Sequence, residues 1–214
     1  MDSTPYSLLT PRALSILGGL VLTGYVYNTY SIAPFINFPE PVAVKLRRAL
    51  FYTNLDLQPN QAIKYYRQAL EVAEQLGMDP FSDEILGVKF QLAYLMEKIK
   101  QYQLAIDVLE IIRADCLKWI EQKGSKAENR AQRTRILSKT VSTSVKLGDL
   151  YSILHEHEAA ESRLVWAVET VLKEQWRREI EGVKDEDEGP WMSPEEHGGA
   201  LEGTQSHPHP SLPC

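Results

Sequence analysis

Apolar residues recur at steps of three and four along much of the chain, as they do on one face of an α-helix. In the run from Ala62 to Leu70, for example, Ala62, Tyr66 and Ala69 would share a single face. No segment stands out that alternates apolar and polar residues between turn signals, the pattern expected of β-strands. The sequence therefore predicts an all-α protein.

One part of the helical pattern has a distinctive spacing. Leu147 and Gly148 are followed by Tyr151, then by Ala160 and Leu164, and Ala167 completes the set. Glycine and alanine let two antiparallel helices approach closely, and the larger residues fill the ridge between them. This is the core-position pattern of a tetratricopeptide repeat (TPR), a helix pair that builds binding surfaces.

Two earlier units match when they are aligned on the packing alanine. One has Leu46, Ala49, Leu50, Ala62, Tyr66 and Ala69, and the other has Leu92, Ala93, Ala105, Leu109 and Ile112. The three alanines lie 43 residues (62 to 105) and 55 residues (105 to 160) apart, so helices or connections must be longer than in a standard repeat of about 34 residues. A generic helical bundle is the alternative. We predict a TPR-like α-solenoid of about three helix pairs over residues 40–182.

Local signals suggest where these helices begin and end. Pro59 suits a first helical turn, and Gly77 suits the end of the same helix. Ser82 is typical of a helix start, and residues 123–126 are expected to form a loop.

The N-terminal region carries an uncharged run from Ala13 to Tyr30, eighteen residues long, after a short flank of residues 1–12. That length just crosses a hydrocarbon core of about 30 Å, so we predict a transmembrane anchor over residues 13–33. Ser15, Gly19 and Thr23 recur at steps of four and form a candidate packing face for a membrane helix, although a chance run of small residues gives the same pattern.

Two alternatives remain for this segment: a signal peptide cleaved near Ser31-Ile32-Ala33, and a buried core helix. The orientation is open. Arg12 precedes the run, and three cations follow it within the first repeat helix.

The composition directs attention to protein partners. A net charge of −6 disfavours a nucleic-acid surface, and the chain lacks the common nucleotide-binding and hydrolase motifs. Cys116 lies in an apolar helical stretch and Cys214 is terminal, so the two make no disulfide or metal framework. His155 and His157 are too closely spaced to share a helical face, and His207 and His209 lie in a polar tail. We therefore expect no enzyme activity, cofactor or metal.

The C-terminal residues 183–214 are predicted to form an acidic linker and a flexible tail. Ser193-Pro194 resembles a helix start, and residues 198–201 offer the opening of a further repeat helix before the sequence becomes rich in proline and histidine.

Three segments resemble fungal TPR proteins of the mitochondrial inner membrane, a family that includes the adaptor subunit of the i-AAA protease supercomplex. They are Leu46–Asn54, Leu76–Glu84 and Arg163–Lys173. The resemblance covers roughly residues 10–200, and the sequence departs from it after about Gly203. It implies a single-pass anchor, repeats in the intermembrane space, and delivery of unfolded proteins to the protease. A membrane-anchored scaffold without client binding is the alternative.

In a TPR array the first helix of each pair lines a concave groove. By the register above, the groove residues are Arg47, Phe51, Asn54, Phe90, Gln91, Tyr94, Ser142, Lys146 and Asp149. Phe51 stands where chaperone-binding TPR domains place a clamp asparagine, so the groove suits apolar, extended segments. The alternative is that some of these aromatic residues pack between repeats.

Overall fold

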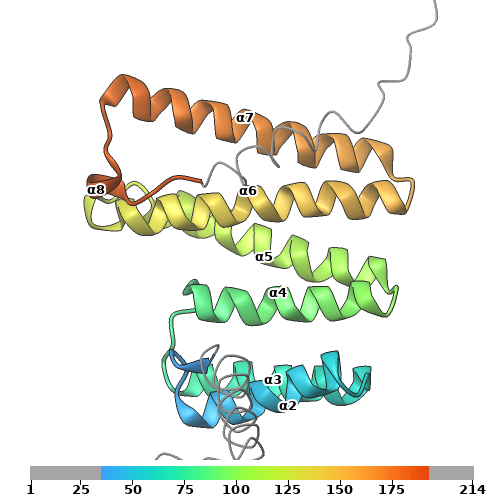
Figure 1. Ribbon diagram of the computed structural model, residues 1–214. Helices are drawn as coiled ribbons and strands as arrows, with labels where there is room; N and C mark the ends of the chain where they lie inside the picture. Colours follow the sequence, from blue (N-terminus) through green and yellow to red (C-terminus); the bar gives the residue numbers. More distant parts are fainter. Residues whose placement is uncertain (1–34, 193–214) are drawn as a thin grey trace, which may run out of the picture. The chain divides into compact units, whose positions relative to one another are not determined.

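The computed structural model describes residues 35–192, and this part of the chain is helical without a strand. The all-α class predicted from the sequence is confirmed. Figure 1 shows the helices in chain order. They are α2 (Glu40–Asn54), α3 (Pro59–Gln75), α4 (Asp83–Lys98), α5 (Tyr102–Lys123), the 3-10 helix η3 (Ala127–Asn129), α6 (Arg130–Ile153), α7 (His157–Glu181) and α8 (Asp185–Glu188).

Consecutive long helices pack as pairs, α2 with α3, α4 with α5 and α6 with α7, and α5 also packs on α6. The expected boundaries agree with these helices. Pro59 occupies the first turn of α3, Gly77 has a φ of 71° just after it, and the Ser82 side chain accepts a hydrogen bond from the Ile85 amide. None of the helices in residues 35–192 has the length and apolar character needed to cross a membrane, and the anchor predicted for residues 13–33 lies outside the described residues.

The described helices fall into two compact units divided between Met78 and Asp79, whereas the sequence suggests one helical domain over residues 40–182. The division falls in the connection between α3 and α4, which contains Gly77 and Asp79-Pro80.

The first unit contains α2 and α3. Ala49, Ala62 and Ala69 are fully buried, so the two helices approach closely. The Tyr66 hydroxyl lies 3.2 Å from the Thr53 hydroxyl in this core, and burial raises the pKa of Tyr66.

The second unit contains the remaining helices, and Gly148 marks the close approach of α6 to α7. A Cβ atom at Gly148 would lie 2.5 Å from Cγ of Leu164. The sequence predicts that Gly148 faces Ala160; both residues are buried, but the nearest atoms to the missing side chain belong to Leu164.

The segment after α7 differs from the predicted acidic linker, because residues 185–188 form α8 and attach to the preceding helices (Figure 1). Glu188 is buried and pairs with Arg177, and Asp185 lies 3.2 Å from Arg178. Trp191 and Met192 then pack against a buried cluster of Val141, Ala167 and Val171. The folded region therefore continues to at least Met192.

Candidate peptide-binding groove

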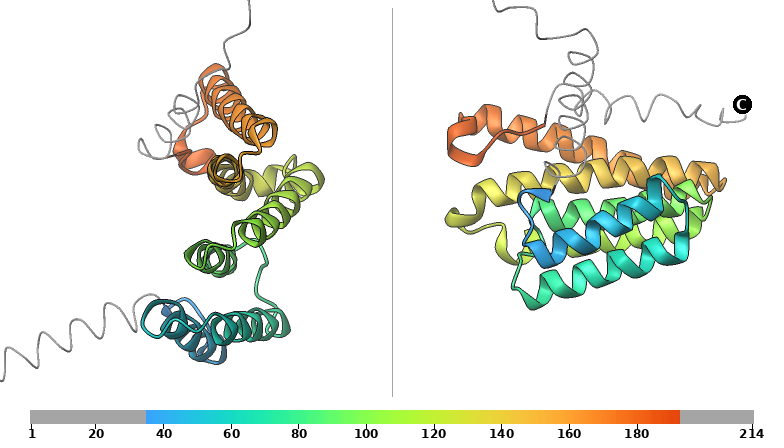
Figure 2. Two further views of the ribbon diagram at one scale, coloured as in Figure 1. Left: turned by 90° about the vertical axis from the view of Figure 1, so that its right-hand side faces the viewer. Right: turned by 60° about the horizontal axis from the view of Figure 1, so that its bottom comes forward.

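Within the second unit, α4 and α6 run in the same direction and lie on one side of α5 (Figure 2). Ion pairs connect the two helices near both ends. Asp83 lies 3.1 Å from Arg135 at their N-terminal turns, and Glu97 lies 2.8 Å from Lys146 towards the other end. Two ion pairs therefore connect the first helices of two successive pairs.

We call the surface between these ion pairs the α4–α6 face. It comprises Gly87, Phe90, Gln91 and Tyr94 from α4, and Ser138, Lys139, Ser142 and Lys146 from α6. The helical periodicity places all four α4 residues on the side of that helix opposite its buried residues, which include Ile85, Val88, Leu95 and Met96.

The centre of this face is aromatic and open. The Tyr94 side chain is 49% exposed and Phe90 is half-buried on the same side of α4. A Cβ atom at Gly87 would meet nothing within 4 Å, so packing does not require a glycine there. The missing side chain leaves room for another backbone to approach α4 closely.

A cleft of about 600 Å³ opens at the N-terminal end of the face. Its walls come from the starts of α4 and α6 and from the chain after α8: Asp79, Asp83, Ala131, Gln132, Arg135, Ser138, Lys139, Gly189, Pro190 and Trp191. The structure holds several of these side chains in place. Gln132 donates to Asp79 at 3.0 Å, and Arg135 donates to the Phe81 carbonyl at 3.1 Å.

The face offers both apolar contact and hydrogen bonds. Tyr94 and Phe90 supply ring surface, while Gln91, Ser142 and Lys139 supply polar groups at its margins. Its charges are largely paired, as at Glu97 and Lys146, so the surface suits an extended peptide better than a small charged molecule.

The structure places the predicted groove residues in two sets. Phe90, Gln91 and Tyr94 lie on α4, and Lys146 lies opposite them on α6 with the exposed residues Ser142 and Asp149. Arg47, Phe51 and Asn54 instead lie on one face of α2 in the first unit. The two sets therefore lie in different compact units.

In the first unit, Arg47 is engaged locally. Its guanidinium donates to both carboxylate oxygens of Glu40, at 3.0 and 3.3 Å, and lies 5.7 Å from the centre of the Phe35 ring. Phe51 is 46% exposed and its ring meets Tyr52 edge-on. Phe51 and Asn54 are both exposed, so these two residues are better placed than Arg47 to contact a ligand.

Sequence analysis missed the partners that define the ends of the α4–α6 face. Glu97 and its partner Lys146 are 49 residues apart in the sequence, and Asp83 and its partner Arg135 are 52 apart. The packing alanines of the same two units, Ala105 and Ala160, are 55 residues apart. The opposite charges are visible in the sequence. Which of these charges pair cannot be read from the sequence, because α6 is longer than α4 and its extra residues change which side chains of the two helices lie opposite one another.

Other candidate chemistry is weak in the described region. Burial raises the pKa of the Cys116 thiol, which favours the unreactive protonated form. His155 and His157 lie at the turn between α6 and α7, with ring centres 6.1 Å apart. Residues 35–192 contain no group of three metal-binding side chains, and His207, His209 and Cys214 lie outside them.

Comparisons of the chain with protein-family models, with curated proteins and with solved structures gave no match. The class that the structure itself defines is a helical protein whose consecutive helices pack in pairs.

Proposed function

We propose that this protein is a membrane-anchored TPR-like adaptor that binds extended segments of unfolded proteins and presents them to a mitochondrial i-AAA protease. The observation that carries the proposal is the α4–α6 face, where exposed Tyr94 and half-buried Phe90 lie between two ion pairs. Unfolded proteins expose apolar side chains together with unpaired backbone groups. A surface that combines aromatic rings with polar side chains offers contacts to both.

The remainder of the proposal comes from the sequence. The uncharged run Ala13–Tyr30 supports a membrane anchor, and the resemblance to fungal inner-membrane TPR proteins supports a mitochondrial protease as the partner. In this proposal the repeats lie in the intermembrane space, Ser15, Gly19 and Thr23 pack against a partner helix in the membrane, and Phe51 of the first unit also contacts clients.

The decisive experiment measures the affinity of the full-length protein, in detergent, for a reduced and carboxymethylated model protein. Tyr94→Ala should weaken binding about 30-fold, because truncating a good aromatic anchor costs about 2 kcal/mol. The matched control is Leu104→Ala on α5, since Leu104 is also 49% exposed. Circular dichroism establishes that both variants are folded. Equal binding by Tyr94→Ala and the control would contradict the proposal.

A second candidate is a membrane-anchored scaffold that organises a complex without handling clients. It is favoured by the exposed apolar residues on the outer side of α7, including Trp176 at 67% exposure. Affinity purification separates the two functions. Recovery of an AAA protease supports the adaptor, and a stable stoichiometric complex without one supports the scaffold.

A further inference from the structure

Two half-buried arginines of the second unit, Arg113 on α5 and Arg163 on α7, are both held by their Nε atoms. Arg113 donates from Nε to the Ser144 hydroxyl at 2.9 Å, and Arg163 donates from Nε to Oε1 of Glu110 at 2.7 Å. The Tyr151 hydroxyl donates to the same Glu110 oxygen at 3.0 Å. Partners on three helices thus fix the positions of both guanidinium groups.

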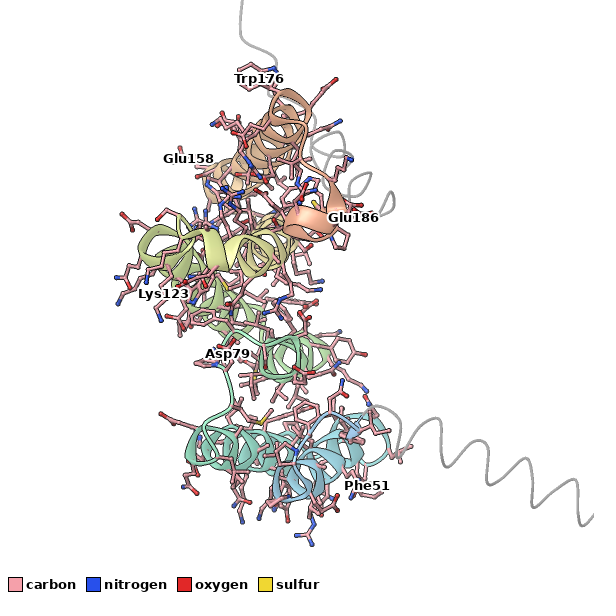
Figure 3. All side chains as sticks on the ribbon, turned by 90° about the vertical axis from the view of Figure 1, so that its left-hand side faces the viewer. Phe51, Asp79, Lys123, Glu158, Trp176 and Glu186 are labelled. Atoms are coloured by element: carbon pink, nitrogen blue, oxygen red, sulfur yellow. The ribbon has the colours of Figure 1, made fainter. Side chains whose placement is uncertain are left out.

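The two guanidinium groups share one surface between α5 and α7. The centre of the Arg113 guanidinium lies 4.6 Å from the centre of the Trp166 ring, and Trp166 follows Arg163 by one helical turn on α7. Figure 3 shows the start of α7, near Glu158, on the same side of α6 as α5. The arginines therefore lie close to each other, about one helical turn apart.

The positive charge of this pair is incompletely compensated. The Nη atoms of Arg113 and Arg163 form no hydrogen bond within residues 35–192, whereas Arg177 in the same unit donates from Nη to a carboxylate. Burial, and then the neighbouring charge of Arg163, lower the pKa of Arg113, and the opposing effect of Glu110 is smaller. Because arginine stays charged in proteins, the fold holds a cation that a nearby anion would stabilise.

The open hydrogen-bonding positions here are donors. The neighbouring hydroxyl groups are already engaged, since Ser144 donates to the Thr140 carbonyl at 2.9 Å and Tyr151 donates to Glu110. The Nη atoms remain, and the end of a guanidinium group matches a planar carboxylate through two parallel hydrogen bonds. The ligand that fits is therefore an acceptor with negative charge.

Charge and exposure narrow the ligand further. Two guanidinium groups and the single carboxylate of Glu110 leave one excess positive charge, which one more carboxylate would neutralise. The side chains of Arg163 and Glu110 are 27 and 26% exposed, so a side chain of another protein can reach them from solvent.

We propose that Arg113 and Arg163 form a docking site for an acidic segment of a partner protein, in which a carboxylate side chain binds their Nη atoms. Helical spacing places Ser144 on the opposite side of α6 from Ser142 and Lys146, so this site is separate from the α4–α6 face. The proposal is independent of client binding. Its consequence is that the protein can hold a partner on one side while the other side is occupied.

The test measures binding of a fluorescein-labelled peptide of alternating glutamate and alanine to the full-length protein in detergent, by fluorescence anisotropy. A peptide with glutamine in place of glutamate should bind much more weakly. Arg113→Gln and Arg163→Gln should each weaken binding of the glutamate peptide about tenfold, the loss expected for a charge-assisted hydrogen bond. Arg67→Gln is the matched control, because it removes the same charge from an exposed position on α3 and should leave binding unchanged.

A second measurement on the wild-type protein avoids any change in the packing of α5 and α7. Phenylglyoxal modifies accessible guanidinium groups, and mass spectrometry locates the modified residues. Saturating glutamate peptide should protect Arg113 and Arg163 and leave Arg67 reactive. Equal binding of the two peptides, equal effects of the three substitutions, or no protection at Arg113 and Arg163 would each overturn the proposal. Protection by a serine-phosphorylated peptide alone would overturn the assignment to a carboxylate.

Discussion

At the residue scale, Gly148 determines how closely α6 and α7 approach. The spacing of Leu147, Gly148 and Ala160 was sufficient to predict a close helix crossing here. It was not sufficient to identify Leu164 as the nearest neighbour of Gly148, because the relative tilt and offset of two helices depend on side chains along their whole length. Sequence spacing reveals which residues share a face, and packing then selects the contacts.

We predict that Gly148→Ala destabilises the second unit by about 1–3 kcal/mol, because the added methyl group overpacks the crossing. Its Cβ would lie 2.5 Å from Cγ of Leu164, and Leu164 is itself only 3% exposed. Urea denaturation followed by circular dichroism measures the change. Adding Leu164→Ala should make the effect of Gly148→Ala smaller, and an unchanged midpoint in Gly148→Ala would show that the crossing is assigned wrongly.

Gly87→Ala is the matched control in the same unit. Because a Cβ at Gly87 meets nothing within 4 Å, alanine should stabilise α4 by about 0.5–1 kcal/mol through its better helix propensity. The two glycines should therefore respond with opposite signs. If both substitutions lowered the stability, the loss in Gly148→Ala could not be assigned to the close contact between its Cβ atom and Leu164.

At the scale of elements, local signals predicted the long helices, whereas tertiary contacts were needed to predict α8. Pro59 and Ser82 act on the helix turn in which they stand, so their effect is readable from the sequence. The acidic stretch 185–188 alone resembles a solvated linker. It is held in α8 by Arg177 and Arg178, whose positions depend on the packing of α7.

Glu174 is the centre of this ion-pair network and is only 4% exposed. Burial would raise the pKa of its carboxyl, but hydrogen bonds from Arg177 and Arg133 outweigh burial and lower it. A carboxyl whose pKa is lower in the folded state stabilises the fold above its ordinary pKa. This stabilisation is lost as the pH falls through the lower folded value.

We therefore predict that Glu174→Gln destabilises the protein at pH 7 by about 1–3 kcal/mol, and that the difference from wild type shrinks as the pH falls below about 4.5. Urea midpoints of both proteins across this pH range provide the test. Glu121→Gln is a suitable control, because Glu121 is an exposed carboxylate on α5 and the same change there should cost little at any pH. A difference that stays constant with pH would exclude Glu174 as the titrating group.

At the scale of the whole molecule, the sequence indicated helix pairs in all three places where residues 35–192 have them. It also suggested one continuous helical domain, whereas the structure divides between Met78 and Asp79. A repeat pattern describes the inside of each pair. It does not describe how firmly one pair is joined to the next, because that depends on side chains outside the repeated core positions.

The proposed anchor belongs to this scale as well. We predict that the full-length protein stays in the membrane pellet after alkaline carbonate extraction, because Ala13–Tyr30 is uncharged over a length that crosses a bilayer. Gly19→Arg should shift the protein towards the supernatant, since a cation at the centre of a membrane helix costs about 2.5–3.5 kcal/mol on insertion scales. Release of the wild-type protein into the supernatant would contradict the predicted membrane anchor.

The central claim is that extended, unfolded chains bind at the α4–α6 face, and site-specific photo-crosslinking tests it most directly. A photoreactive phenylalanine analogue replaces Tyr94 on α4 in one full-length protein and Lys118, an exposed residue of α5, in another. Each is irradiated with a reduced, carboxymethylated model protein. We predict crosslinks from position 94, lost on competition with unlabelled unfolded protein, and background levels from position 118. Equal crosslinking at both positions, or none at position 94, would contradict the account.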